Sequence, residues 1–188
     1  MFSKIFKEFF LKKIVNKRLL SYRLNDSDDK VETIGIIVDE TYFTNKDKLI
    51  SALLKKGFNK EQLTILVFKE KVKAKEVIEE PFFSLKNITI SGKINKAELE
   101  DFVAKKFDLL INYYDEPKAV LNMVAKKSAA NFKVGFSAID KRINHLIIAS
   151  NVDAIDEFVE ELFKYLKILN KWNGNAGCNS TKFHSLSQ

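Results

Sequence analysis

Three short runs of apolar residues constrain the fold of this chain more than any other feature. They are residues 34–38 (IGIIV), 63–68 (LTILVF) and 108–114 (DLLINYY). A strand with one face in water alternates apolar and polar residues, whereas a strand covered on both faces is apolar almost throughout. The runs therefore predict buried strands of a sheet that carries helices on both faces.

Helical patterns separate these strands. Leu49, Ile50, Leu53 and Leu54 form one apolar stripe before Gly57, and the clearest helix follows residue 152, with apolar residues at i, i+3 and i+4 up to Leu169. We expect further helices at 96–106, capped by Asn95, and at 117–129. Strands that alternate with helices build right-handed βαβ units. The prediction is an α/β, Rossmann-like three-layer domain with a mostly parallel sheet over residues 31–171.

The other segments are less regular. Residues 132–137 and 143–150 are predicted strands, and residues 88–94 alternate as an edge strand or a hairpin arm would. Residues 70–95 as a whole give no clear assignment. Residues 172–188 are rich in Gly, Asn, Ser and Thr, and we expect a flexible polar tail.

Charge is concentrated at the start of the chain. The net charge is +7, of which residues 1–25 contribute +6 and the remaining 163 residues +1. We predict that residues 1–25 form a basic amphipathic helix to about Leu24, with a stripe of Phe2, Ile5, Phe6, Phe9 and Phe10. Its cations are Lys4, Lys7, Lys12, Lys13, Lys17, Arg18 and Arg23. Localised charge of this kind bears on partners rather than on the fold.

Three interpretations of this helix compete. It binds RNA, with its cations neutralising phosphates; it lies on an anionic membrane surface; or it packs its phenylalanine stripe on the domain and leaves its lysines in water. Between the two binding interpretations we favour RNA, because the apolar stripe loses its register after Phe10. Lys141 and Arg142 are candidates for a second RNA contact.

A second candidate site follows from the carboxyl ends of the strands, where open parallel sheets collect ligands. The residues expected there include carboxylates, tyrosines and one histidine: Asp39, Glu40, Tyr113, Asp115, Asp140 and His145. They would form a ligand pocket, with Lys141 and Arg142 holding a phosphate. The alternative, which we prefer, is that these residues cap helices and pair on the surface, and that His145 is half-buried and hydrogen-bonded.

No motif for standard catalysis or cofactor binding is present. The turn after the first strand is DETYF rather than GxGxxG, and neither GxxxxGK[ST] nor GxSxG occurs. The lone Cys178 and two distant histidines make a structural metal site improbable. We therefore assign no catalytic residue, no metal and no cofactor, and whether the chain is an enzyme stays open, with a preference for no.

No run of about 18 apolar residues exists, so no transmembrane helix is expected. The apolar residues 9–11 are too few for a signal peptide and are followed at once by Lys12 and Lys13. We expect a cytoplasmic protein.

Four segments carry a resemblance to known proteins: DETYF at 39–43, DLLINYYD at 108–115, FKVGFSAIDKRINH at 132–145 and FVEELFKYLKILNK at 158–171. On these the chain resembles an uncharacterised family of short proteins from Bacteroidota, which implies no function. Over about 30 residues, DLLINYYD and FKVGFS also look like the N-terminal half of heptosyltransferase-type glycosyltransferases. The chain lacks the second nucleotide-sugar domain and the glycine-rich first loop of those enzymes, so this likeness implies shared α/β architecture only.

Together these features predict a non-enzymatic binding protein whose partner is RNA or a ribonucleoprotein such as the ribosome. The alternatives are a small-ligand-binding or transferase-like protein that uses the strand ends, and a membrane-peripheral scaffold.

Overall fold

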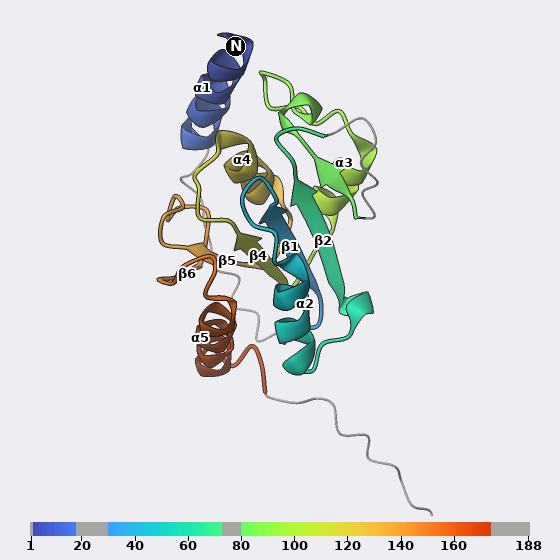
Figure 1. Ribbon diagram of the computed structural model, residues 1–188, viewed down its shortest axis with the longest axis vertical. Helices are drawn as coiled ribbons and strands as arrows, with labels where there is room; N and C mark the ends of the chain where they lie inside the picture. The colour runs from blue at the N-terminus through green and yellow to red at the C-terminus, as the bar shows by residue number, and fades with distance from the viewer. Residues whose placement is uncertain (1, 18–29, 73–79, 174–188) are drawn as a thin grey trace, which may run out of the picture.

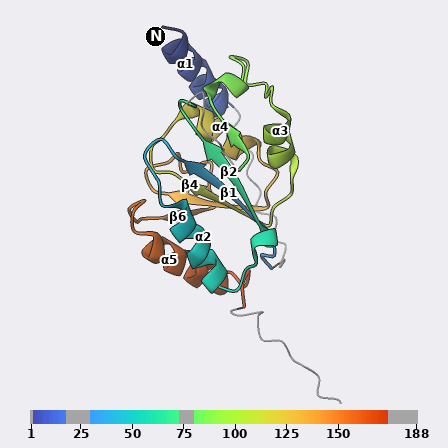
Figure 2. The same cartoon turned by 45° about the vertical axis from the view of Figure 1, so that its right-hand side comes forward.

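The computed structural model describes residues 2–17, 30–72 and 80–173. Within them, one sheet of six strands runs through the molecule, with helices on both faces (Figures 1 and 2). The strands are β1 (Ile34–Asp39), β2 (Leu63–Phe68), β3 (Phe82–Phe83), β4 (Leu109–Tyr113), β5 (Phe132–Phe136) and β6 (Leu146–Ile148). The helices are α1 (Phe2–Lys17), α2 (Lys46–Lys55), α3 (Ala97–Ala104), α4 (Ala119–Lys127) and α5 (Ile155–Ile168), with short 3₁₀ turns η1 (Lys60–Gln62) and η2 (Leu85–Asn87).

The strand order is β3-β2-β1-β4-β5-β6, and every neighbouring pair is parallel. This is the order of a Rossmann-type sheet, in which the chain builds outward from β1 in one direction and then from β4 in the other. The predicted α/β three-layer fold is confirmed, and the sheet is entirely rather than mostly parallel.

The core is built on the two central strands. All residues of β1 and β4 are buried, as the apolar runs predict. On one face Tyr113 packs against Phe136 and Phe158, with ring centroids 5.0 Å apart in each pair. On the other face the Phe107 ring covers Gly35, where an added Cβ would lie 2.7 Å from Cδ2 of that ring. Glycine is therefore required at position 35 by packing.

The helices divide between the two faces. α2 and α5 pack side by side on one face, and α3 and α4 cover the other (Figures 1 and 2). The helix α1 packs on α4 and runs in the same direction: Glu8 contacts Ala119 at the start of α4, and Val15 contacts Lys126 near its end. Because α4 begins at the carboxyl edge of the sheet, the first turns of α1 project beyond that edge (Figure 1).

Two predicted details differ from the structure. The edge strand is the short β3 rather than residues 88–94, in which Ile88 and Ile94 form only an isolated antiparallel bridge. Residues 82–83 form the edge strand because they pair with β2, and the Phe83 ring packs on Phe68 of that strand. Asn95 does not cap α3, whose N-cap is Lys96. The predicted end of the first helix near Leu24 lies outside the described residues, as does the predicted tail at 172–188 from residue 174 on. The start of that tail is not free, because the Trp172 ring packs edge-on against Phe163 of α5.

Candidate functional site

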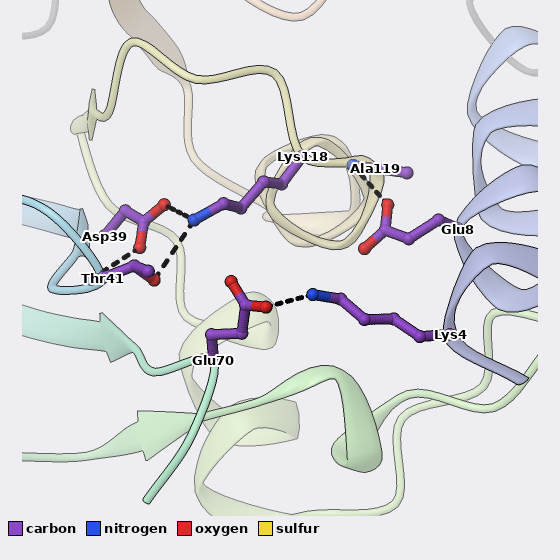
Figure 3. A network of polar contacts seen from close by, with 7 residues as sticks. All are labelled: Lys4, Glu8, Asp39, Thr41, Glu70, Lys118 and Ala119. Atoms are coloured by element: carbon purple, nitrogen blue, oxygen red, sulfur yellow. Dashed lines mark hydrogen bonds and ion pairs between the residues drawn. The ribbon is translucent and has the colours of Figure 1, made fainter. Parts of the chain in front are cut away.

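The carboxyl edge of the sheet holds a network of charged side chains (Figure 3). Asp39, the last residue of β1, is buried, and its carboxylate pairs with Lys118, which comes just before α4. Lys118 also donates to the Thr41 hydroxyl at 3.2 Å, and the N–H of Thr41 donates to Asp39 at 2.9 Å. The network ties the loop after β1 to the start of α4, on either side of the point where the strand order reverses.

Glu40 belongs to a second network on the same edge. Its carboxylate accepts from Lys46 at 2.9 Å and from Lys69 at 2.7 Å, and Lys46 also pairs with Glu80. Burial alone would raise the pKa of Glu40, but the hydrogen bonds from Lys69 and Lys46 outweigh it and leave this pKa lowered. Glu40 therefore stays ionised and serves to hold its neighbours.

The first turns of α1 reach into the same edge from outside. Lys4 pairs with Glu70, which follows β2, and Lys7 donates to the carbonyl oxygen of Leu85 at 2.7 Å. Glu8 accepts the N–H of Ala119 at 3.1 Å, at the start of α4 (Figure 3). Burial raises the pKa of Glu8, against the lowering effect of that N–H. These contacts fix α1 over the carboxyl edge.

α1 turns its phenylalanine stripe away from the domain. Leu11 and Val15 are the buried residues, at 0% and 3% exposure, whereas Ile5, Phe6 and Phe9 are 62–68% exposed. Of the three interpretations of this helix, the one in which the stripe packs on the domain is therefore wrong for Ile5, Phe6 and Phe9. The inward face consists of apolar residues that lie off the stripe. The sequence shows both apolar faces but does not indicate which one packs on the domain.

The predicted cations of the N-terminal helix have different environments. Lys4 and Lys7 are engaged as described above, while Lys12 and Lys13 are exposed. The side chains of Lys17, Arg18 and Arg23 lie outside the described residues.

Hollows flank α1 on several sides. The largest at its N-terminal end has a volume of about 490 Å³ and is lined by lysines from α1, from the segment after β2, from η2 and from the start of α4. A second, of about 350 Å³, lies along Phe9 and Lys12, and a third, of about 550 Å³, lies between Ile14 and Lys93. Lysines from segments far apart in sequence are thus gathered round one helix.

A family model matches residues 7–169, which include most of α1 and every other described helix and strand. It is the model of a family of unknown function, DUF6913. The chain belongs to this family. No curated protein and no solved structure matches it. Membership in DUF6913 therefore supports an uncharacterised α/β family and supplies no active site.

The six residues predicted to form a strand-end pocket are not gathered in one place. Asp39 and Glu40 belong to the two ion-pair networks, and the Tyr113 hydroxyl donates to the carbonyl of Val152 at 2.7 Å within the core. Burial raises the pKa of the Tyr113 phenol. Asp115 follows β4 and is half-buried, and Asp140 lines the hollow beside Phe9.

Asp140 and Arg142 form a local pair in the loop after β5. The Arg142 guanidinium donates from Nε at 2.9 Å and from Nη2 at 2.7 Å to the two carboxylate oxygens. This pairing lowers the pKa of Asp140. Arg142 is thus matched by a neighbouring carboxylate, while Lys141 between them is exposed.

His145 lies at the opposite edge of the sheet from Asp39, because it precedes β6. Its ring stacks on Phe132 with centroids 5.1 Å apart, and Nδ1 accepts the N–H of Lys133 at 2.8 Å. Burial, with the charges of Lys133 and Lys171, lowers the pKa of His145 to about 4. The expected half-buried, hydrogen-bonded histidine is what the structure contains.

Sequence reasoning missed the residues that organise the edge. Lys118 and Glu70 sit in loops, where charged side chains are common and carry no periodic signal. The buried Lys133 was also missed: its Nζ donates to the carbonyls of Ala125 and Ser128 at 2.9 and 2.8 Å, and burial lowers its pKa to about 8. The sequence offers one signal for it: Lys133 lies in a predicted buried strand that directly follows a predicted helix, whose last carbonyls can accept from its Nζ.

Two kinds of feature are absent from the part of the chain that the structure describes. Residues 2–17, 30–72 and 80–173 contain no group of three or more His, Cys, Asp or Glu side chains arranged to hold a metal ion. Over the same residues, every helix is too short or too polar to cross a bilayer.

Proposed function

We propose that this protein is a non-enzymatic binding protein that docks onto RNA, or onto a ribonucleoprotein such as the ribosome, through the end of the molecule around α1. One observation carries the proposal: exposed lysines from several distant segments surround an exposed aromatic helix face. We call this surface the basic end. Its lysines are Lys12, Lys13, Lys71, Lys86, Lys93 and Lys127.

Three acidic residues at this end are already engaged. Glu70 pairs with Lys4, Asp140 with Arg142, and Glu8 accepts the N–H of Ala119. Among the described residues, no carboxylate pairs with any of the six lysines of the basic end. The surface therefore keeps an excess of positive charge that attracts a polyanion.

The exposed rings suit single-stranded RNA. Phe6 and Phe9 offer ring faces on which unpaired bases stack, and the lysines beside them neutralise the phosphates between those bases. Because the lysines lie along hollows on more than one side of α1, a flexible strand follows them more readily than a flat bilayer does. This favours RNA over an anionic membrane.

The proposal is tested by fluorescence anisotropy with a labelled single-stranded RNA of mixed sequence, over a salt series. If all six lysines contact phosphates, the logarithm of the binding constant falls with the logarithm of salt concentration with a slope of about −4. Point variants are preferable to removal of α1, because Leu11 and Val15 belong to the core.

The informative variants are Phe6→Ser with Phe9→Ser, and Lys12→Gln with Lys13→Gln. The first pair should weaken binding about tenfold or more through lost stacking, and the second should reduce the salt slope by about 1.4. A matched control is Ile168→Ser with Lys167→Gln on α5, where Ile168 is as exposed as Ile5. Equal affinity of all three variants would refute the RNA proposal.

Flotation with vesicles tests the membrane-peripheral alternative. That alternative expects binding to anionic vesicles, loss of binding in the Phe6/Phe9 variant and no binding to RNA. We place the proposed activity in the cytoplasm, where RNA and ribosomes are found. From the resemblances described above, we also propose that the family occurs in Bacteroidota and that its sheet is related to that of heptosyltransferase-type enzymes.

A further inference from the structure

We infer that the 490 Å³ cavity between α1 and the carboxyl ends of β2 and β3 binds a small phosphomonoester. Its position supports this, because ligands of doubly wound sheets bind outside the carboxyl ends of the strands, near the point where the strand order reverses. Its volume lies within the range of small-molecule sites. This site shares Lys71 and Lys86 with the surface proposed for RNA, whereas Lys4, Lys7 and the apolar lining belong to the cavity alone.

The lining has the charge that a phosphate needs. It includes Lys4, Lys7, Lys71, Lys86 and Lys118, against only two glutamates, Glu8 and Glu70. Lys4 is neutralised by Glu70, and Lys118 by Asp39 at its back. Lys7, Lys71 and Lys86 remain, and with Glu8 counted against them the lining keeps a net charge of +2.

Lys7 is the residue most in need of an anionic partner. It is half-buried, and its Nζ donates to the neutral carbonyl oxygen of Leu85. Burial lowers the pKa of Lys7, with no compensating carboxylate. A dianionic phosphate beside Nζ would restore the solvation that the ammonium has lost, and Lys86 in the turn η2 is placed to share it.

The rest of the lining suits the body of a small organic molecule. Phe68, Leu85 and Pro117 present apolar atoms, and Ser84 presents a hydroxyl. The start of α4 is not available to the phosphate, because Glu8 already accepts the N–H of Ala119 there. The phosphate would therefore be bound by lysine side chains rather than by backbone N–H groups. This agrees with the sequence, which has no glycine-rich loop after the first strand.

The test is calorimetric titration of the full chain with ribose 5-phosphate, using ribose as the uncharged match. Ribose 5-phosphate should bind, and ribose should not. Lys7→Gln combined with Lys86→Gln should weaken binding about tenfold or more, Lys7→Arg should retain it, and Lys127→Gln, which lines another hollow, should leave it within about twofold of the parent.

A phosphate of the RNA backbone could occupy the same cavity as a free phosphomonoester, and the experiment distinguishes these two ligands. The Phe6→Ser, Phe9→Ser variant should keep its affinity for ribose 5-phosphate even if it loses RNA, since neither ring lines this cavity. If ribose 5-phosphate binds no better than ribose, or binds equally well to the Lys7/Lys86 variant, the inference is overturned. It is also overturned if that variant loses only RNA binding.

Discussion

The helices α1 and α5 each carry a regular apolar stripe, yet one stripe is exposed and the other is buried. In α5, Phe158 and Leu162 are fully buried against the sheet. In α1, Phe6 and Phe9 are more than 60% exposed, and the helix is held by Leu11 and Val15 instead. α5 therefore uses its apolar stripe to build the core, whereas α1 leaves an aromatic face exposed on the surface.

The cause lies in how many apolar faces each helix has. α5 has one long buried stripe, and apart from Tyr165 and Ile168 near its end the exposed side chains are charged, so only one orientation buries it well. α1 has apolar residues on two faces, and the polar contacts of Lys4, Glu8 and Val15 select which of them turns inward. A contiguous exposed aromatic face is uncommon in proteins that act alone, which is why we assign it to a partner.

The largest effect expected of a single change is in α5. Phe158→Ala should lower the free energy of unfolding by about 3–5 kcal/mol, because the cavity lies among Tyr113 and Phe136 and cannot collapse. Urea denaturation measures it, with the more exposed Tyr165→Ala on the same helix as the control. A loss below about 1 kcal/mol would mean that α5 is not the core helix described above.

The inward face of α1 should give a smaller but clear effect. Leu11→Ala should lower the free energy of unfolding by about 2–4 kcal/mol, since Leu11 is fully buried against the domain. Hydrogen exchange can show whether the loss is local to α1 or global. Leu169→Ala, at an exposed position, is the matched control. Equal stabilities of the two variants would argue that α1 does not dock through this face.

His145 gives a pH-dependent effect outside both helices. Its pKa is about 4 in the folded protein and near 6.5 when unfolded. Between these values the unfolded chain binds more protons, so stability should fall as pH decreases through 6.5 and level off below about 4. Allowing for partial exposure, the loss is roughly 2 kcal/mol. Comparing urea midpoints of the parent and His145→Gln over this range measures it, and parallel curves would contradict the assignment.

The smallest expected change sharpens the comparison most. Phe6→Ser and Phe9→Ser should each alter the free energy of unfolding by less than about 0.5 kcal/mol, because exposed side chains contribute little to folding. Thermal and urea unfolding measure this on the same samples used for RNA binding. A loss comparable to that of Leu11→Ala would show that the aromatic face is covered in solution.

Much of the fold follows from the sequence, because buried parallel strands and α5 have patterns that only one arrangement satisfies. Residues 63–68 match β2 at both ends, and Gly57 ends the helix before it with a φ of 101°. The two-residue β3 was missed because so short a strand is defined by its pairing with β2 rather than by a pattern of its own.

The site was less predictable, because its contacts join segments distant in sequence. The pair of Asp39 with Lys118 spans 79 residues, and that of Lys4 with Glu70 spans 66. Such contacts depend on which loops share an edge and on where α1 docks. The sequence places His145 inside a predicted strand at 143–150, whereas β6 covers only Leu146–Ile148 and His145 precedes it. Its position at the amino edge of the sheet depends on the strand register, which the sequence does not show.

The parallel packing of α1 on α4 has an electrostatic consequence. Two helices that run side by side in one direction align their macrodipoles, and aligned dipoles repel. Glu8 places a negative charge at the positive end of α4, and Lys126 places a positive charge on the carbonyl of Val15, near the negative end of α1. Each charge offsets part of that repulsion, and both are weakened by added ions. Because ions also screen the dipoles themselves, the docking of α1 at high ionic strength rests mainly on the buried side chains of Leu11 and Val15.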